Sequence, residues 1–294
     1  MSLRHALALV GLVFSVTGTA EAKFMPDNNL DQQDSLESTG GITQAQFNAV
    51  IDRAERIFKP IVAGFGATYT VNRRWTDTTV NADASQSGNS WLVNMYGGLA
   101  RRAEVTEDGF AAVLCHETGH HLGGYPFYRG DNWAANEGQS DTFTAGNCVR
   151  LLWKNDPANA NSRATVPVIA KAKCDAAYST TADQDLCYRA MNASKSTADL
   201  LAALGGDQIA FDTPDTNEVD ETKDEHPAAQ CRLDTYVAAA LCSGLTWDTT
   251  VIPGKVNNSA SNDAAAQASS GRFYCQNGTA TPGALRPRCW FKSL

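Results

Sequence analysis

The chain has 294 residues, of which 43% are hydrophobic, so it can bury a sizeable core in one large domain or in one domain with an appended subdomain. Its formal net charge of −8 argues against a nucleic-acid partner, because binding to a phosphate backbone depends on Lys and Arg. Beyond the N-terminal stretch, no segment is apolar and long enough to cross a membrane, so we expect no integral membrane segment once that stretch is removed.

The N-terminal stretch, residues 1–22, is typical of a secretory signal. A short basic start precedes an apolar run over residues 6–16, which is too short to span a bilayer. Ala-Glu-Ala at 20–22 fits a signal cleavage site, so the mature chain is expected to begin at Lys23. An uncut N-terminal anchor is the alternative. With a cleaved signal, the protein is exported and is either periplasmic or secreted.

An even number of cysteines in an exported chain predicts disulfide bonds. The sequence has eight cysteines, and none forms a Cys-x-x-Cys pair, which argues against a Cys-rich zinc finger. Cys174 and Cys187 are close in sequence and are plausible partners. Further bonds are expected to tie down the C-terminal tail, with the order of pairing open: Cys231 and Cys242 with Cys275 and Cys289. Two cysteines remain as candidate free thiols in the core: Cys115 and Cys148.

Polar residues dominate positions 23–41, which we interpret as a flexible leader, with a short inhibitory pro-segment as the alternative. A helix is expected after Thr43, a good N-cap, because apolar side chains recur at helical spacing over 47–58. Pro60 and Gly64 are expected to end this helix.

Short strands are predicted at 67–75, 78–83 and 91–96, with a turn over 83–89, because Thr, Val and aromatic residues gather there. The last strand directly precedes the helix discussed next. In zinc peptidases a strand at this place can bind an extended substrate as a further strand of the sheet. An ordinary sheet strand is the alternative, and an edge strand could serve both roles.

A His-Glu-x-x-His motif lies in a helix that Thr106 is expected to cap and that stops at Gly123. His116 and His120 lie on one face of this helix, about 40° apart around its axis. They can hold one metal ion between them, and Glu117 lies beside that face, where it can reach a water on the ion. A helix with two surface histidines is the alternative.

A catalytic zinc ion has three protein ligands and one open position for water. We predict Glu137 as the third ligand, because the loop after His120 is long enough for a second helix to return against the first. Asp141 lies one turn later on the same face. It is placed to accept the free ring N–H of a liganding histidine and so to fix its tautomer. A solvated acidic face on the second helix is the alternative.

Helical patterns fill much of the remaining chain. Five helices are expected, the first capped by Asp131 or Asn132: 133–154, 166–178, 183–192, 197–204 and 227–243. The acid-rich segment 205–225 is interpreted as a solvated loop, because its acids lack the spacing of an EF-hand calcium site. The tail, 244–294, is rich in Gly, Ser, Asn and Pro and is expected to be irregular.

The two motifs together resemble those of the gluzincin metallopeptidases. The stretch from Asn136 to Asp141 is similar to the Asn-Glu-x-x-Ser-Asp of thermolysin-like enzymes. Other elements resemble the HtpX and CAAX-prenyl-protease type, including its soluble periplasmic members. These elements are Asn81-Ala82 before an edge strand, Gly98-Leu99 ahead of the metal helix, and His226-Pro227 followed by Arg232. The resemblance covers about residues 80 to 145 and 226 to 236.

The resemblance implies an α+β, mainly helical zincin-type catalytic domain over residues 42–243, with a small sheet before the metal helix and the disulfide-tied tail packed on it. The membrane spans of the better-known relatives have no counterpart in this sequence, which leaves their membrane-protein substrates unsupported here. The Cys-containing C-terminal half has no counterpart either.

The expected activity is that of an exported zinc endopeptidase that holds one catalytic Zn²⁺ and cleaves peptides or proteins. Glu117 would act as the general base. The resemblance assigns His226 as a donor to the oxyanion, with a plain residue at the start of a helix as the alternative. Arg232 would pin its helix to the site carboxylates, unless it is a surface residue. Two tyrosines are weaker donor candidates: Tyr125 and Tyr128.

Two other functions remain open. One is a non-catalytic, zinc-bound binding or assembly module, against which the intact Glu117 argues, because such a module has no need of a base. The other is a zinc amidase acting on cell-wall crosslinks. The predicted substrate strand favours peptides over such crosslinks.

Overall fold

The computed structural model describes residues 21–28, 30, 40–130, 133–257, 259–276 and 283–294. The fold is α+β and mainly helical, at 47% helix, with one small sheet, as the sequence predicts. Of the predicted signal, only its last two residues lie in this part of the chain. Within these ranges, no helix combines the length and the apolar composition that a membrane span requires.

The sheet has four strands in the order β1-β3-β4-β2: β1 (Glu21–Lys23), β2 (Thr68–Arg74), β3 (Ala82–Ser87) and β4 (Ser90–Tyr96). β3 and β4 form an antiparallel hairpin through Gly88 and Asn89, and β2 runs parallel to β4. The predicted strand 78–83 and turn 83–89 are therefore wrong. The two-residue Gly-Asn loop is a hairpin signal that sets the strand boundaries farther along the chain.

β4 is an interior strand, since it pairs with β3 on one side and with β2 on the other. Its backbone is already bonded, so the prediction that residues 91–96 form a substrate-binding edge is wrong. β3, which packs against α3, is also an interior strand, because it lies between β1 and β4. It follows Asn81, as the resemblance implies, and β1 pairs with it.

The first residues of the predicted flexible leader are packed into the protein. Lys23 belongs to β1, and the side chains of Phe24 and Met25 are buried in the hydrophobic core. A flexible leader is thus the wrong description of residues 23–25. Although the segment around them is polar, the apolar side chains of Phe24 and Met25 pack in the core. Residues 31–39 of the predicted leader lie outside the described part of the chain.

Helix α1 (Gln44–Gly64) begins at the predicted cap, Thr43, whose side chain and that of Gln46 form a capping box. The prediction that Pro60 ends the helix is wrong, because the helix continues through it. Val62 lies beyond Pro60 and is fully buried, so core packing holds the last turn in helical form.

Two glycines in front of the helix that carries the His-Glu-x-x-His motif are required by close backbone contacts. They open the short helix α2 (Gly97–Ala100). A Cβ atom on Gly98 would lie 1.9 Å from the carbonyl oxygen of Thr78, and one on Gly97 would lie 1.7 Å from that of Trp75. Only glycine fits where the chain passes this close to its own backbone.

The second half of the chain is helical, with some boundaries that differ from those predicted. The predicted helix 133–154 is three consecutive pieces, and it starts later, at the cap Asn136; residues 131–132, the predicted caps, lie outside the described part. The predicted helices 183–192 and 197–204 are parts of one long helix, so the expected break between them is absent. Within it, the hydroxyl of Ser194 donates to the carbonyl of Ala190. The elements are α4 (Glu137–Phe143), the π-helical η1 (Thr144–Cys148), α5 (Val149–Leu152), the 3₁₀-helical η2 (Pro157–Ala164), α6 (Val168–Ala177), α7 (Thr181–Gly205), α8 (Ala229–Leu241) and α9 (Ala264–Ser270).

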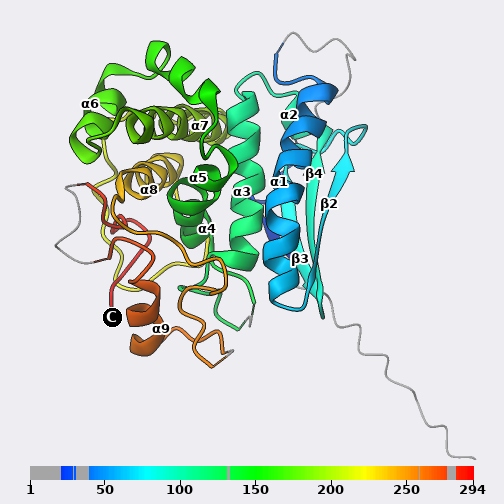
Figure 1. The fold of residues 1–294 in the computed structure, drawn as a ribbon, viewed down its shortest axis with the longest axis vertical. Coiled ribbons are helices and arrows are strands. Elements are labelled where there is room, and N and C mark those ends of the chain that lie inside the picture. Colours follow the sequence, from blue (N-terminus) through cyan, green and yellow to red (C-terminus); the bar gives the residue numbers. More distant parts are fainter. Residues whose placement is uncertain (1–20, 29, 31–39, 131–132, 258, 277–282) are drawn as a thin grey trace, which may run out of the picture.

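Helix α3 (Glu107–Leu122) lies at the centre of the molecule. Figure 1 shows it between α1 and the sheet on one side and α4, α7 and α8 on the other. Its cap Thr106 and its end at Gly123 agree with the prediction. Every residue from Gly109 to Leu122 is buried, so this helix has no solvent face along those turns and its polar side chains are enclosed by protein.

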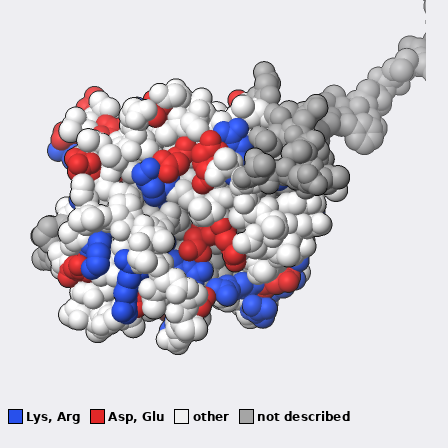
Figure 2. All heavy atoms as spheres, turned by 90° about the horizontal axis from the view of Figure 1, so that it is seen from above, with Lys and Arg blue, Asp and Glu red and all other residues white. Residues whose placement is uncertain are grey.

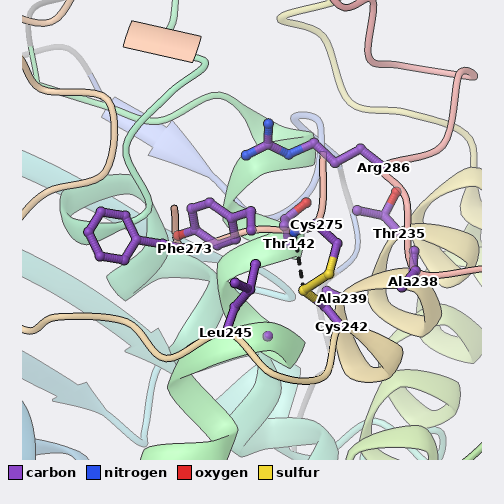
Figure 3. A pocket seen from close by; sticks show the side chains of 12 residues that line it. Thr142, Thr235, Ala238, Ala239, Cys242, Leu245, Phe273, Cys275 and Arg286 are labelled. Carbon is purple, nitrogen blue, oxygen red and sulfur yellow. Dashed lines mark hydrogen bonds between the residues drawn. A yellow bond between two sulfur atoms is a disulfide. The ribbon is translucent and has the colours of Figure 1, made fainter. Parts of the chain in front are cut away.

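Four disulfides link the elements: Cys115–Cys148, Cys174–Cys187, Cys231–Cys289 and Cys242–Cys275. The Cys174–Cys187 bond agrees with the prediction, and so do the bonds that join Cys231 and Cys242 to cysteines of the tail. The prediction of free thiols at Cys115 and Cys148 is wrong, because α3 and η1 pack side by side and bring these residues together. Figure 3 shows where the tail meets the helices, with the Cys242–Cys275 bond between α8 and the tail and Arg286 above it.

Candidate metal centre

The two motif histidines converge on one point. His116 and His120 are fully buried on α3, and their Nε2 atoms are 3.1 Å apart. The Nδ1–H of His116 donates to Asp141 Oδ1 at 2.8 Å, and that of His120 donates to the carbonyl oxygen of Ala135 at 2.8 Å. Both Nδ1 atoms are therefore engaged. The two Nε2 atoms are left to share one cation, either a proton or a metal ion.

Glu137 lies opposite the two rings, at the first position of α4. Its Oε2 is 3.2 Å from His116 Nε2, and its Oε1 is 3.7 Å from His120 Nε2. In a tetrahedral zinc site with ligand bonds of 2.0–2.1 Å, neighbouring donor atoms are about 3.3 Å apart. The three donor atoms of this site have nearly that spacing. Tyr128 also donates its hydroxyl hydrogen to Glu137 Oε1.

Glu117 completes the polar group on α3. It is fully buried, and its carboxylate lies with the two imidazoles in a group whose ligating atoms are all within 4.8 Å of one another. This group could hold a metal ion. Its Oε2 is 4.0 Å from His120 Nε2, which is longer than a direct hydrogen bond.

Asp141 is held by three side chains, those of His116, Arg232 and Tyr236. It accepts the Nδ1–H of His116, as predicted. Arg232 donates to it from Nε at 2.7 Å and from a terminal nitrogen at 2.8 Å, and the hydroxyl of Tyr236 donates at 2.5 Å. Such a fully bonded carboxylate fixes the orientation of the imidazole ring and raises the basicity of its Nε2 atom.

The charges of the site favour a bound cation. Burial lowers the pKa of His120 to about 3, so this ring is neutral. Burial alone would also lower the pKa of His116, but the charges of Asp141 and Glu137 outweigh it and raise that pKa above its usual value. Burial would raise the pKa of Glu137, yet the hydrogen bond and charge of His116 hold it well below its usual range. The pKa of Asp141, which burial would raise, is likewise lowered by the charges of Arg232 and His116, so Glu137 and Asp141 are ionised and stabilise positive charge beside them.

The two residues predicted from far along the chain both reach this site. His226 lies shortly before α8, with Nε2 3.5 Å from Glu137 Oε2 and 23% of its side chain exposed. Arg232 is 1% exposed, so the surface alternative for it is wrong. Its guanidinium binds Asp141 as described above, which attaches α8 to α4.

Two further polar side chains at the end of α3 and just after it lie apart from the site. His121 faces away from the site: it stacks between Trp91 and Trp133 and donates from Nε2 to the Leu92 carbonyl at 3.1 Å. Tyr125 also lies apart, since its hydroxyl donates to Gln267. Of the two tyrosines considered as donors, only Tyr128 contacts the site.

Three residues that contact the site were not predicted. Ser140 has its hydroxyl 3.0 Å from His120 Nδ1, and Tyr236 bonds to Asp141. Local signals existed for both, because Ser140 lies inside the quoted motif and Tyr236 is one helical turn after Arg232. Phe24 packs edge-on against His116, with ring centres 5.3 Å apart. Nothing local in the sequence indicates that contact.

A second group of possible metal ligands lies near the start of α8. It consists of Asp215, Cys231 and Cys289. The two cysteines form a disulfide with each other, so they have no thiolate to offer and this group is not a metal site.

A hollow at the start of α3 lies away from the histidines. It has a volume of about 460 Å³ and is lined by charged groups around the start of the helix, among them Asp108, Asp156 and Arg189. These groups pair with one another, Arg189 binding both acids at 2.7 and 3.1 Å. Figure 2 shows a face on which acidic and basic side chains lie next to one another instead of forming a field of one sign. The charged side chains that line this hollow are therefore explained by their pairing with one another.

Comparisons with family models, with curated proteins and with solved structures found no match to this chain. The interpretation of the site therefore depends on its own residues. These are two imidazoles and a carboxylate at ligand spacing, a second carboxylate beside them, and a bonded Asp–Arg pair behind them.

Proposed function

We propose that this protein is an exported zinc endopeptidase of the gluzincin type, with a zincin-type catalytic domain that resembles the HtpX and CAAX-prenyl-protease group. The observation that carries the proposal is the spacing of His116 Nε2, His120 Nε2 and the Glu137 carboxylate. Two imidazoles and one carboxylate suit zinc in a catalytic site, which keeps a fourth position open.

The residues take the following roles. Zinc in such a site lowers the pKa of bound water to about 7 and polarises a carbonyl group. Glu117, buried beside both imidazoles, accepts the proton of the attacking water and later delivers it to the leaving amine. Asp141 orients His116 throughout, and the Ala135 carbonyl orients His120.

His226 donates a hydrogen bond to the oxyanion that forms from the scissile carbonyl. Two observations support this role. Its Nε2 atom lies on the Glu137 side of the site, and it already donates to a backbone carbonyl, that of Lys23, at 2.8 Å. Tyr128 is engaged with Glu137, so its contribution is to hold that ligand in place.

Peptides are the substrate class that the sheet supports. The strand β3 follows Asn81-Ala82 and runs beside α3, and the side of it that β1 covers can pair with an extended chain once β1 is displaced. A cell-wall crosslink would make no use of such an edge. Export is compatible with the four disulfides, which persist in oxidising compartments.

The test is a comparison of Glu117→Gln with the unaltered protein. Zinc content and hydrolysis of casein are measured for both, with and without a zinc chelator. We expect the variant to keep its zinc and to lose at least about 100-fold in rate, as for removal of a general base. Glu107→Gln is the matched control, because Glu107 is an exposed acid on the same helix.

Three outcomes separate the possibilities. Cleavage at the original rate by Glu117→Gln would overturn the peptidase mechanism. Zinc binding without hydrolysis of casein or of any member of a peptide library would point to a non-catalytic zinc-bound module. Hydrolysis confined to cell-wall fragments would point to an amidase.

A further inference from the structure

The outer edge of β3 is covered by the chain's own N-terminal residues. Lys23 lies opposite Asp83 in the antiparallel pairing of β1 with β3, and the N–H of Phe24 donates to the Ala82 carbonyl at 3.0 Å. This is the manner in which an extended peptide adds to an open sheet edge. The added strand is short, and its contacts concentrate on three residues.

The side chain of Asn81 binds the end of this strand through the backbone N–H and carbonyl of Met25. Its side-chain oxygen accepts the N–H of Met25 at 3.1 Å, and its amide nitrogen donates to the carbonyl of Met25 at 3.1 Å. A side-chain amide that binds only the backbone of a residue does not select for the side chain of that residue. It is therefore suited to bind peptides of varied sequence.

Two carbonyl groups of the strand point into the candidate metal centre. The carbonyl of Lys23 accepts from His226 Nε2 at 2.8 Å, and His226 is 3.5 Å from Glu137. The carbonyl of Phe24 accepts from Arg232 at 2.6 Å, and Arg232 binds Asp141. The peptide bond between Lys23 and Phe24 thus lies beside the carboxylates and donors to which the proposed reaction is assigned.

The side chain of Phe24 fills a pocket at the site. It is fully buried, its ring meets that of His116 edge-on at 5.3 Å, and the guanidinium of Arg232 lies over its face at 4.6 Å. An apolar ring in contact with a predicted metal ligand covers that side of the ligand. It also indicates which side chain the pocket accepts, namely an aromatic one.

We propose that Lys23, Phe24 and Met25 occupy the peptide-binding groove of this site as a built-in strand. An external peptide binds along β3 in the same register, with an aromatic residue in the Phe24 pocket, and it does so only after this strand has left. The inference deepens the proposed function and rests on it for the identity of the groove. All three residues follow the predicted signal cleavage site, so they remain in the chain when the signal, with Glu21 and Ala22 of β1, is removed.

The first experiment converts the strand into a separate ligand. A recognition sequence for a specific protease is inserted among residues 31–39, and the chain is cut there and dialysed. A fluorescent peptide with the sequence of residues 21–28 is then added to the metal-free protein, and its binding is followed by anisotropy. We expect saturable binding to the cut protein that is at least about ten-fold tighter than to the uncut protein, because the tethered strand competes.

Matched peptides test the register. Replacing Phe24 by Ala in the peptide should weaken binding at least about ten-fold, since the ring loses its pocket. Replacing Asp27 by Asn is the control, because Asp27 is exposed and its ion pair is with Lys23, outside the Phe24 pocket. Equal binding of all three peptides, or equal binding to cut and uncut protein, would overturn the proposal. So would loss of the fold after dialysis, seen by circular dichroism, since the strand would then be structural.

The second experiment leaves the chain uncut. Phe24→Ala should release zinc to a chelator at least about ten-fold faster than Asp27→Asn, with an unchanged equilibrium affinity for zinc, because the cover of His116 opens more often. Equal release rates would overturn the proposal.

The same variants separate this proposal from the peptidase itself. Faster release with peptide competition, but no cleavage by any variant, would keep the built-in strand and overturn the endopeptidase. Cleavage that is equal in all variants, without peptide competition, would keep the endopeptidase and overturn the built-in strand.

Discussion

The candidate centre depends on a small number of side chains whose roles follow from their bonding. The imidazoles present Nε2 to a common point because their Nδ1 atoms are engaged elsewhere. Glu137 faces them from the first turn of α4, a position that the cap Asn136 defines. Loss of any one of these groups leaves the other two in place, so each can be tested singly.

Glu137→Ala should weaken zinc binding by at least about 100-fold, because it removes one of three ligands. Losing a ligand must cost more affinity than losing a residue that only bonds to a ligand. Zinc affinity is measured by competition with a chelating dye. Glu107→Ala, on the exposed start of α3, is the control. A Glu137→Ala protein that binds zinc as tightly as the parent would show that another group is the third ligand.

Arg232→Met should lower the free energy of unfolding by about 3–5 kcal/mol, because it leaves the buried Asp141 without its charged partner. Urea denaturation measures this change. Arg288→Met removes an arginine from an exposed pair with Glu218 and should change stability by less than about 1 kcal/mol. Similar effects of the two substitutions would mean that the Asp–Arg pair does not stabilise the fold.

At the scale of the elements, the site depends on how α4 is held against α3 and the tail. Gly119 on α3 approaches the backbone of Ser140 on α4, where a Cβ atom would lie 3.0 Å from that residue. On another side of α4, the indole of Trp290 lies directly over Gly138. The tail thus presses α4 into position, and a glycine next to Glu137 makes room for it.

Gly138→Ala should destabilise the protein by about 1–3 kcal/mol, because its Cβ atom would lie 2.2 Å from the ring of Trp290. It should also weaken zinc binding, since α4 or the tail must shift. Gly146→Ala is the matched control: its Cβ atom would meet Ala239 at an ordinary 3.6 Å. Urea denaturation and zinc competition report both effects. Equal stability of the two variants would refute this account of the tail.

At the scale of the whole molecule, the disulfides join segments that the sequence separates. Cys115 lies next to the first predicted ligand on α3, and its partner Cys148 ends the π-helical turn after α4. α3 is thereby linked covalently to the π-helical turn that directly follows α4. By contrast, Cys174–Cys187 links α6 to α7, on the side of α7 away from the sheet in Figure 1.

The double variant Cys115→Ala, Cys148→Ala should lose about 3–4 kcal/mol of stability, from the entropy of a loop that spans 33 residues. It should also weaken zinc binding. The matched variant at Cys174 and Cys187 opens a loop of 13 residues, and should lose about 3 kcal/mol while keeping zinc affinity. Thermal denaturation and zinc competition measure these effects. Equal losses of zinc affinity would contradict a specific role for the first bond.

Much of the candidate site could be predicted from the sequence, because its main features are local. The spacing of His116 and His120 sets them on one helix face, and Thr106 and Gly123 mark the ends of that helix. Asp141 follows Glu137 by one turn, so its contact with a liganding histidine was expected as well. These relations hold within a few residues, where helix geometry alone decides.

Only the tertiary structure decided the rest, because those contacts join residues that no local rule relates. It placed β4 inside the sheet instead of at its edge, and it buried Phe24 against His116. It also brought Cys148 to Cys115, where free thiols had been expected. A sequence specifies such pairs through the packing of the whole core, in which every element constrains the others, and spacing along the chain carries no trace of that.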